Sequence, residues 1–160
     1  MHWVANPMTS AKANRDFFES RTDGKNGYGS AHYIVGLSGE VIQCIPCNEV
    51  AYHVGTDKKD PASGRLYTDW WRSVGNKMVP NWGTIGVELC HIDWEGHFGQ
   101  ATLDAASELV ADLLREHNLT TSAVGTHNMV VGWKDCPRLW TREPELFYDW
   151  REDLKKWTKE

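Results

Sequence analysis

The feature of this sequence that most constrains its fold is an apolar, strand-like segment followed closely by an amphipathic helix. Over residues 84–91, apolar side chains fall on alternate positions, as on a strand with one buried face: Ile85, Val87 and Leu89. After Thr102, which is predicted to cap the helix, they recur at helical spacing as far as Asn118: Leu103, Ala106, Leu109, Val110, Leu113 and Leu114. Each element has an apolar side that another element must cover.

Other local patterns extend this pair to an alternation of helices and strands. Ser10 is predicted to cap a short helix that ends near Arg21. Strand-like runs at residues 32–37 and 40–45 predict a hairpin. Further elements are expected as a strand before the turn at Asn6-Pro7, strands at residues 50–54 and 123–127, and a last helix from Glu143-Pro144. This mixed order predicts the α/β class, with a central sheet and helices packed on it.

Length and charge narrow the class of protein. A chain of 160 residues is typical of a single domain. The net charge of −5 argues against a nucleic-acid partner. No run is long and apolar enough to span a membrane, and no signal peptide opens the sequence. We therefore expect a protein that acts in the cytoplasm, leaves the cell by another route, or is an excised domain.

Two further features leave alternatives open. The polar residues 56–81 are expected to form a long surface excursion with one helical turn, as lids and insertions do. Nine tryptophans fit either core packing or loops that line a site for sugars or peptides.

The four cysteines do not suggest a disulfide framework. Cys44 and Cys90 lie in strand-like runs and are predicted to be buried free thiols. Cys44 and Cys47 form a C-x-x-C pair, which could be half of a structural zinc site or a redox pair. We favour two unrelated thiols, because no second ligand pair follows and the motif lies at a strand end.

Residues 125–138 concentrate the residue types that carry metal chemistry. His127 and Cys136 are too far apart for one helical face, but a strand end and the following loop could bring both onto one ion. His2 is our candidate for the third ligand. Two histidines and a cysteine leave a fourth zinc position open for water, as catalysis requires. The alternative for each residue is an ordinary structural role.

Glu88 interrupts the apolar strand. It either points to solvent from a polar face, which the pattern alone favours, or projects into a cleft. Beside a metal-activated water it would be a natural general base. Lys134 would then stabilise the oxyanion formed on a carbonyl.

The remaining histidines fall into two groups. His32 and His53 lie in predicted strands beside tyrosines, and each could line the pocket, hydrogen-bond a metal ligand, or be a core histidine. The other three are expected on the surface: His91, His97 and His117.

The combined motifs resemble the zinc-dependent N-acetylmuramoyl-L-alanine amidases, the family that includes phage endolysins, bacterial autolysins and the peptidoglycan recognition proteins. The pieces that carry the resemblance, in the family's order, are HWVANP (2–7), SAHYIV (30–35), GEVIQCIP (39–46), EVAYHVG (49–55), TIGVELC (84–90), THN (126–128) and KDCPR (134–138). Together they are specific, and the likeness is closest to the catalytic domains of Gram-positive phage endolysins and autolysins.

This resemblance implies a mixed central β-sheet flanked by α-helices, with a cleft that binds Zn²⁺. By position, the implied zinc ligands are His2, His127 and Cys136. The implied catalytic residues are Glu88 and Lys134, and His53 matches a histidine of the substrate cleft. The implied reaction is hydrolysis of the amide bond between N-acetylmuramic acid and L-alanine in peptidoglycan.

The sequence also departs from the family pattern. Ala31 stands where some members have a tyrosine, so more of the chemistry rests on Glu88. The first strand is expected to be short, because His2 is the second residue. No separate wall-binding domain is evident, so residues 1–160 are expected to be one catalytic domain, monomeric and active on the bacterial cell wall. It would reach the wall from outside, or by release from the host cytoplasm in the case of a phage lysin.

Two other functions remain as alternatives. One is a peptidoglycan-binding module without catalysis, although such modules commonly lack the cysteine ligand that Cys136 supplies here. A metal assay distinguishes it, since a binding module needs no zinc. The other is a redox or metal-sensing protein built on Cys44 and Cys47. If the protein is an amidase instead, replacing both cysteines with serine should leave lysis intact.

Overall fold

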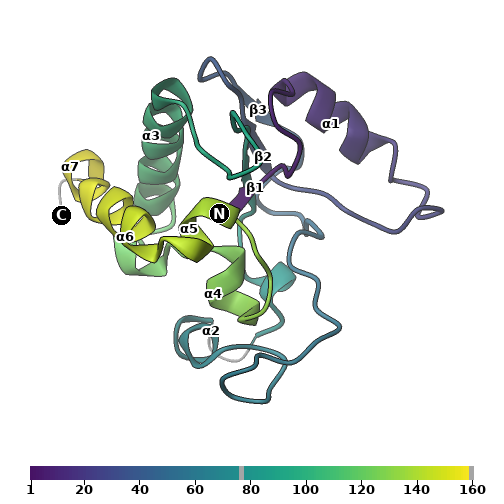
Figure 1. Ribbon diagram of the computed structural model, residues 1–160, viewed down its shortest axis with the longest axis vertical. Coiled ribbons are helices and arrows are strands. Elements are labelled where there is room, and N and C mark those ends of the chain that lie inside the picture. Colours follow the sequence, from purple (N-terminus) through teal and green to yellow (C-terminus); the bar gives the residue numbers. More distant parts are fainter. Residues whose placement is uncertain (76–77, 159–160) are drawn as a thin grey trace.

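A four-stranded mixed sheet forms the centre of the molecule (Figure 1). The computed structural model describes residues 1–75 and 78–158. The strands are β1 (His2–Trp3), β2 (Tyr33–Val35), β3 (Val41–Gln43) and β4 (Val87–Leu89), in the spatial order β1-β4-β2-β3. Strand β4 pairs in parallel with β1 and β2, and β3 pairs antiparallel to β2. The predicted class and the predicted hairpin are confirmed.

Helices cover both faces of this sheet. The helices of the described residues are α1 (Ala11–Glu19), α2 (Asp69–Val74), α3 (Gln100–Glu116), α4 (His127–Val131), α5 (Arg138–Arg142), α6 (Pro144–Asp153) and α7 (Lys155–Thr158), with 3-10 turns η1 (Pro80–Trp82) and η2 (Thr121–Ala123). Figure 1 shows α3, α6 and α7 on one side of the sheet and α1 on the other. Within the part of the chain that the structure describes, no helix has the length and apolarity of a membrane crossing.

Alternation along the strands divides the apolar residues between two cores. Val35 and the strand β4 side chains Val87 and Leu89 pack with α3 and α6 in the main core. Ile34, one position away, packs against Ala11 of α1 in a smaller core on the other face. This is the two-residue period expected of strands. A third cluster joins α2 to α4 through Trp71 and Val130.

Of the two predicted helix N-caps, one is confirmed and the other is wrong. The Ser10 side chain accepts a hydrogen bond from the Ala13 amide, so the predicted cap of α1 is confirmed. The predicted cap at Thr102 is wrong, because α3 begins at Gln100 after Gly99. Thr102 is instead fully buried, and its hydroxyl donates to the Gly36 carbonyl.

Three further element predictions need correction. Residues 50–54 pair with no strand in the described parts of the chain, because the Asn81 side chain accepts from the amides of His53 and Val54. Residues 121–123 form η2 rather than a strand, and His127 begins α4. The last helix is divided into α6 and α7. The predicted excursion at 56–81 contains α2 and the start of η1, and its residues 76–77 lie outside the described residues.

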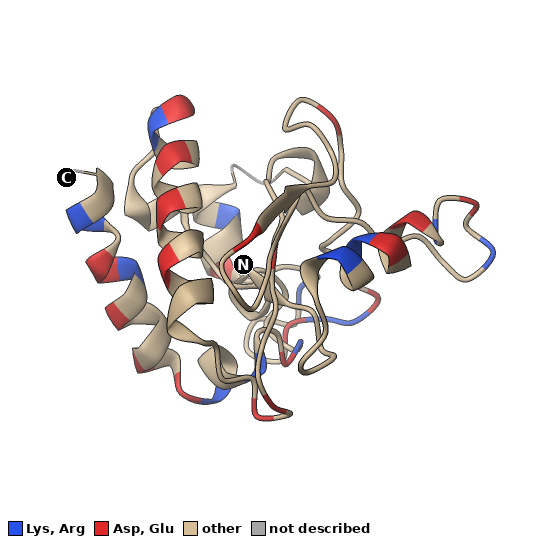
Figure 2. Cartoon of the chain, turned by 90° about the horizontal axis from the view of Figure 1, so that it is seen from above, with Lys and Arg blue, Asp and Glu red and all other residues tan. Residues whose placement is uncertain are grey.

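Acidic residues recur along α3 and are coloured red in Figure 2. They recur every four residues and are exposed: Asp104, Glu108, Asp112 and Glu116. This spacing keeps one helical stripe polar while the opposite stripe packs on the sheet. The four cysteines are free, and Cys90 is buried as predicted, whereas Cys44 is only partly buried.

Candidate metal centre

Strand pairing brings His2 beside Glu88. The two are register partners in the parallel pair β1 and β4. Val87 and Leu89 lie in the main core, so the side chain of Glu88 between them points from the opposite face of β4. His2 is therefore next to a carboxylate at the end of the sheet.

The segment that follows η2 supplies His127. The Thr126 hydroxyl accepts a hydrogen bond from the Met129 amide, which makes His127 the first residue of α4. The His127 amide donates to the Met1 carbonyl over 3.1 Å. That bond fastens the start of the helix to the start of strand β1, so His127 lies beside His2.

A tight reversal after α4 brings Cys136 back to the same place. The helix ends at Gly132, whose φ of +80° favours glycine. A Cβ there would also lie 2.1 Å from Oδ1 of Asp60. The chain then returns, and the Asn128 amide donates to the Cys136 carbonyl over 3.0 Å. This hydrogen bond closes the loop with Cys136 next to His127.

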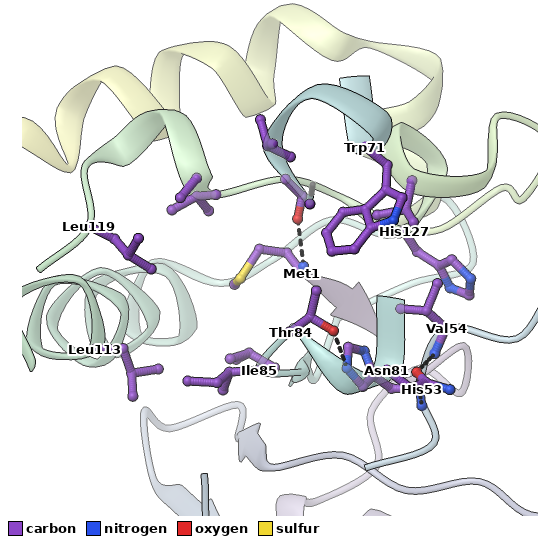
Figure 3. A pocket seen from close by; sticks show the side chains of 18 of the residues that line it. Met1, His53, Val54, Trp71, Asn81, Thr84, Ile85, Leu113, Leu119 and His127 are labelled. Atoms are coloured by element: carbon purple, nitrogen blue, oxygen red, sulfur yellow. Dashed lines mark hydrogen bonds between the residues drawn. The ribbon is translucent and has the colours of Figure 1, made fainter. Parts of the chain in front are cut away.

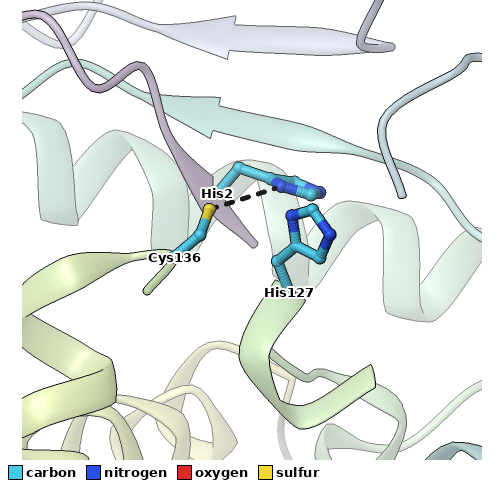
Figure 4. A group of neighbouring side chains, drawn as sticks. All are labelled: His2, His127 and Cys136. Atoms are coloured by element: carbon cyan, nitrogen blue, oxygen red, sulfur yellow. Dashed lines mark hydrogen bonds between the residues drawn. The ribbon is translucent and has the colours of Figure 1, made fainter. Parts of the chain in front are cut away.

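These three side chains turn toward one another (Figure 4). One potential ligand atom from each of His2, His127 and Cys136 lies within 4.8 Å of the other two. His2 Nδ1 is 3.7 Å from Cys136 Sγ. The centroids of the two imidazole rings are 4.8 Å apart in an edge arrangement. All three side chains are buried.

Burial keeps the two imidazoles neutral. It lowers the pKa of His127 to about 4 and that of His2 well below its ordinary value. It raises the pKa of the Cys136 thiol to about 12, with the nearby Glu88 charge as a further cause. Neutral imidazole is the form that binds metal, whereas the thiol must lose its proton when an ion binds.

The donor set fits a zinc ion. Two imidazoles and a thiolate are ligands that zinc takes readily, and they leave a fourth position open. Bonds of roughly 2.1 Å to nitrogen and 2.3 Å to sulfur would put the two atoms about 3.6 Å apart in a tetrahedron, near the 3.7 Å between His2 Nδ1 and Cys136 Sγ. His127 Nε2 is buried and has no hydrogen-bond partner among the described residues. A metal ion would satisfy that atom.

Glu88 and Lys134 line the same pocket as the three candidate ligands. This pocket, of about 230 Å³, is also bordered by Tyr52 and His53. Only 9% of Glu88 is exposed, so the solvent-facing alternative is wrong. Burial raises the pKa of its carboxyl to about 8. Lys134 is exposed, and its ammonium lies 5.5 Å from the centre of the Trp133 ring.

His53 also lines a second cavity of about 480 Å³ (Figure 3), as do His2 and His127. Its Nδ1 lies 2.8 Å from His2 Nε2, and its Nε2 lies 2.9 Å from the Thr84 hydroxyl. Burial lowers its pKa to about 3. His53 thus contacts a candidate ligand directly, which was one of the alternatives for it.

His32 does not join the site. It is 1% exposed, and both of its ring nitrogens are already used. Nδ1 accepts from the Gly86 amide, and Nε2 donates to the Glu49 carbonyl. The prediction that His32 binds substrate is therefore replaced by the core-histidine alternative, because no ring nitrogen is left for a ligand.

His91 also differs from expectation. It was predicted on the surface, but it is fully buried and its ring packs 4.5 Å from that of Trp3. His97 and His117 are exposed as predicted.

Two residues of the site were missed from the sequence: Asn81 and Thr84. Both contact the segment that carries His53. Their only local signal is a short run rich in turn-forming residues, PNWGTIG, directly before the strand at Val87.

Comparisons with known proteins point to one family. A family model described as N-acetylmuramoyl-L-alanine amidase matches residues 1–139. CwlL of Bacillus licheniformis, an N-acetylmuramoyl-L-alanine amidase, is 33% identical over 155 residues, which are 96% of this chain and 39% of that protein. BlyA of Bacillus subtilis (strain 168), an amidase of the same name, is 29% identical over 97% of this chain and 40% of its own length. This chain thus spans about two fifths of these relatives.

Solved structures share the fold. The PlyG catalytic domain superposes with a TM-score of 0.69 at 21% identity, over 98% of this chain and 79% of that one. PlyL superposes with a TM-score of 0.68, also at 21% identity, over 96% of this chain and 79% of that one.

Proposed function

The chain belongs to the N-acetylmuramoyl-L-alanine amidase family, and from that membership we propose that it hydrolyses the amide bond between N-acetylmuramic acid and L-alanine in peptidoglycan. One observation carries the proposal. The potential ligand atoms of His2, His127 and Cys136 converge in a pocket that also contains Glu88 and Lys134. A metal-binding group, a proton acceptor and a cation therefore meet in one cleft, as amide hydrolysis requires.

We propose that His2, His127 and Cys136 hold a zinc ion. When bound, zinc polarises a carbonyl and lowers the pKa of a water molecule to about 7. The three residues come from β1, the start of α4 and the loop before α5. Main-chain hydrogen bonds join these segments, so the donor atoms are held close together before any ion arrives.

Glu88 is the proposed general base and acid. Its carboxyl takes a proton from the attacking water and later gives it to the departing alanine nitrogen. The burial that raises its pKa to about 8 suits a group that exchanges protons near neutral pH. Lys134, on the exposed side of the pocket, offsets the negative charge that develops on the carbonyl oxygen.

We further propose that residues 1–160 act as one catalytic unit, monomeric, on the peptidoglycan of bacterial cell walls. The net charge of −5 and the acidic face of α3 oppose binding to nucleic acid or to an anionic membrane surface.

Digestion of purified Gram-positive cell walls tests the reaction. The zinc-loaded protein is expected to release new alanine amino termini, measured by amino-terminal labelling, without new reducing sugars. Reducing sugars without alanine termini would identify a glycosidase instead. Wall binding with neither product would identify a binding module.

A further inference from the structure

A row of hydrogen bonds leads away from the candidate metal centre. His2 Nε2 lies 2.8 Å from His53 Nδ1, and His53 Nε2 lies 2.9 Å from Thr84 Oγ1. Thr84 Oγ1 lies 2.7 Å from the Pro80 carbonyl oxygen. Figure 3 shows the contact between Thr84 and His53 at the edge of the larger cavity. The row thus joins a candidate ligand to the backbone of η1.

Counting protons gives the row a direction. A carbonyl oxygen only accepts, so Thr84 must donate its single hydroxyl proton to Pro80. Thr84 Oγ1 then accepts from His53, which puts the one proton of a neutral His53 on Nε2. His53 Nδ1 is therefore an acceptor, and His2 must donate from Nε2. His2 then carries no proton on Nδ1, the nitrogen that faces Cys136.

We propose that Thr84 and His53 are positioning residues that hold the proton of His2 on Nε2 and so present its Nδ1 lone pair to the metal. This inference rests on the proposed zinc-dependent function. If every hydrogen bond in the row ran the other way, Thr84 would donate to His53 and His53 would donate to His2 Nε2. His2 would then carry its proton on Nδ1, which faces Cys136 and the proposed metal position. In that arrangement Thr84 could not donate to the Pro80 carbonyl, so this carbonyl favours the His2 tautomer that can bind metal through Nδ1.

The surroundings of His53 hold its ring in this row. The Asn81 side chain accepts from the amides of His53 and Val54, over 3.2 and 2.8 Å. Gly86 lets the ring approach the backbone, since a Cβ there would lie 2.5 Å from Cγ of His53. Pro80, Asn81, Thr84 and Gly86 all belong to residues 80–86. This single segment therefore shapes the site of His53.

The first experiment compares zinc affinity in three variants, by competition with a chromophoric chelator. Thr84→Val keeps the shape of the side chain but removes the hydroxyl, and it is expected to weaken zinc binding by roughly 10–100-fold, as loss of a partner that orients a metal-bound histidine does. Thr84→Ser keeps the hydroxyl and is expected to stay within about threefold of the parent protein.

Thr102→Val is the matched control. Like the Thr84 hydroxyl, the Thr102 hydroxyl donates to a backbone carbonyl, that of Gly36, over 2.9 Å, but it contacts no candidate ligand. Thr102 is fully buried, whereas Thr84 is half-buried, so the control is at least as sensitive to a lost buried hydroxyl. A general loss of stability would affect both valine variants. Weaker zinc binding in Thr84→Val alone supports the proposal, and equal zinc affinity in the two overturns it.

Nitrogen-15 NMR of the imidazole rings in metal-free protein gives a second readout that needs no activity. The expected spectrum has the His2 proton on Nε2, and in Thr84→Val part of it moves to Nδ1. A parent protein with the His2 proton on Nδ1 overturns the inference.

The two proposals can fail separately. If the parent protein binds zinc but releases no alanine termini from walls, the amidase function fails, and the zinc titration still decides the role of Thr84. If the parent protein binds no zinc, the metal-dependent function fails, and the ring spectra alone decide the position of the His2 proton.

Discussion

Within the part of the chain that the structure describes, two regions each contain a buried histidine with an unpartnered Nε2, and they have different surroundings. In the candidate metal centre, formed by His2, His127 and Cys136, the unpartnered atom belongs to His127. In the other region, the contact between His91 and Trp3, it belongs to His91. The two regions are close along the chain, since Glu88, which lines the pocket of the candidate metal centre, lies three positions before His91.

The difference shows that an unpartnered nitrogen does not by itself indicate a metal site. His91 donates from Nδ1 to the Asp93 carbonyl, and its ring packs on an indole. Among the described residues, the only group of three possible metal ligands includes His127 and leaves out His91. The convergence of several potential ligand atoms therefore distinguishes a metal-binding site from a histidine that is simply buried by packing.

The largest expected effect comes from removing a ligand. In Cys136→Ser or His127→Ala, zinc affinity is expected to fall by more than the roughly 10–100-fold that loss of an orienting partner costs. Release of alanine termini from walls falls to background. Elemental analysis after dialysis measures the zinc content. A variant that keeps both its zinc and its activity would remove that residue from the ligand set.

Glu88→Ala separates chemistry from metal binding. We expect zinc to remain bound while turnover falls by roughly 10²–10⁴-fold, the usual contribution of a general base. Turnover within a few-fold of the parent protein would exclude Glu88 from the mechanism. Zinc content measured on the same sample shows whether the metal centre is intact.

Acid should destabilise the metal-free protein. Burial lowers the folded-state pKa of His53 to about 3 and of His127 to about 4, and lowers that of His2, all from an ordinary value of 6.5. The unfolded chain therefore takes up protons first as the pH falls below 6.5. Each histidine then lowers the free energy of unfolding by about 1.4 kcal/mol per pH unit, until the pH reaches its folded-state pKa.

Glu88 acts in the opposite direction in this window. Its folded-state pKa is raised to about 8 from 4.5. The stability that it contributes is therefore full below pH 4.5 and is lost as the pH rises toward 8, so Glu88 stabilises the fold as the pH falls. The three histidines outweigh it, and Glu88→Gln is expected to steepen the loss of stability in acid. Urea unfolding of chelator-treated protein between about pH 7 and about pH 5 measures both slopes. A flat profile in the parent protein would contradict the prediction.

The smallest effect is expected at the contact between His91 and Trp3. His91→Gln loses ring packing and the hydrogen bond to Asp93, so the free energy of unfolding should fall by about 1 kcal/mol. Zinc affinity should not change, because His91 contacts no candidate ligand in the described residues. A loss of zinc as large as that in His127→Ala would mean that the two regions are not separate.

The sequence predicted those parts of the fold that depend on near neighbours. The cap at Ser10, the hairpin and the amphipathic α3 all follow from spacing within one element. The extended segment at residues 50–54 failed as a strand because its partner is the distant side chain of Asn81. His127 was expected at a strand end, but Thr126 caps a helix there.

What the sequence determined by itself is the set of chemically capable side chains and the family to which their order belongs. Only the tertiary structure decided which of them meet. His2 and Cys136 are 134 positions apart and lie 3.7 Å from each other. Local periodicity does not indicate which face of β4 is covered, so the direction of Glu88 and the burial of His32 and His91 depended on the sheet order and on the segments packed around it. The proton on His2 depends in the same way on a carbonyl of η1, which is distant in sequence.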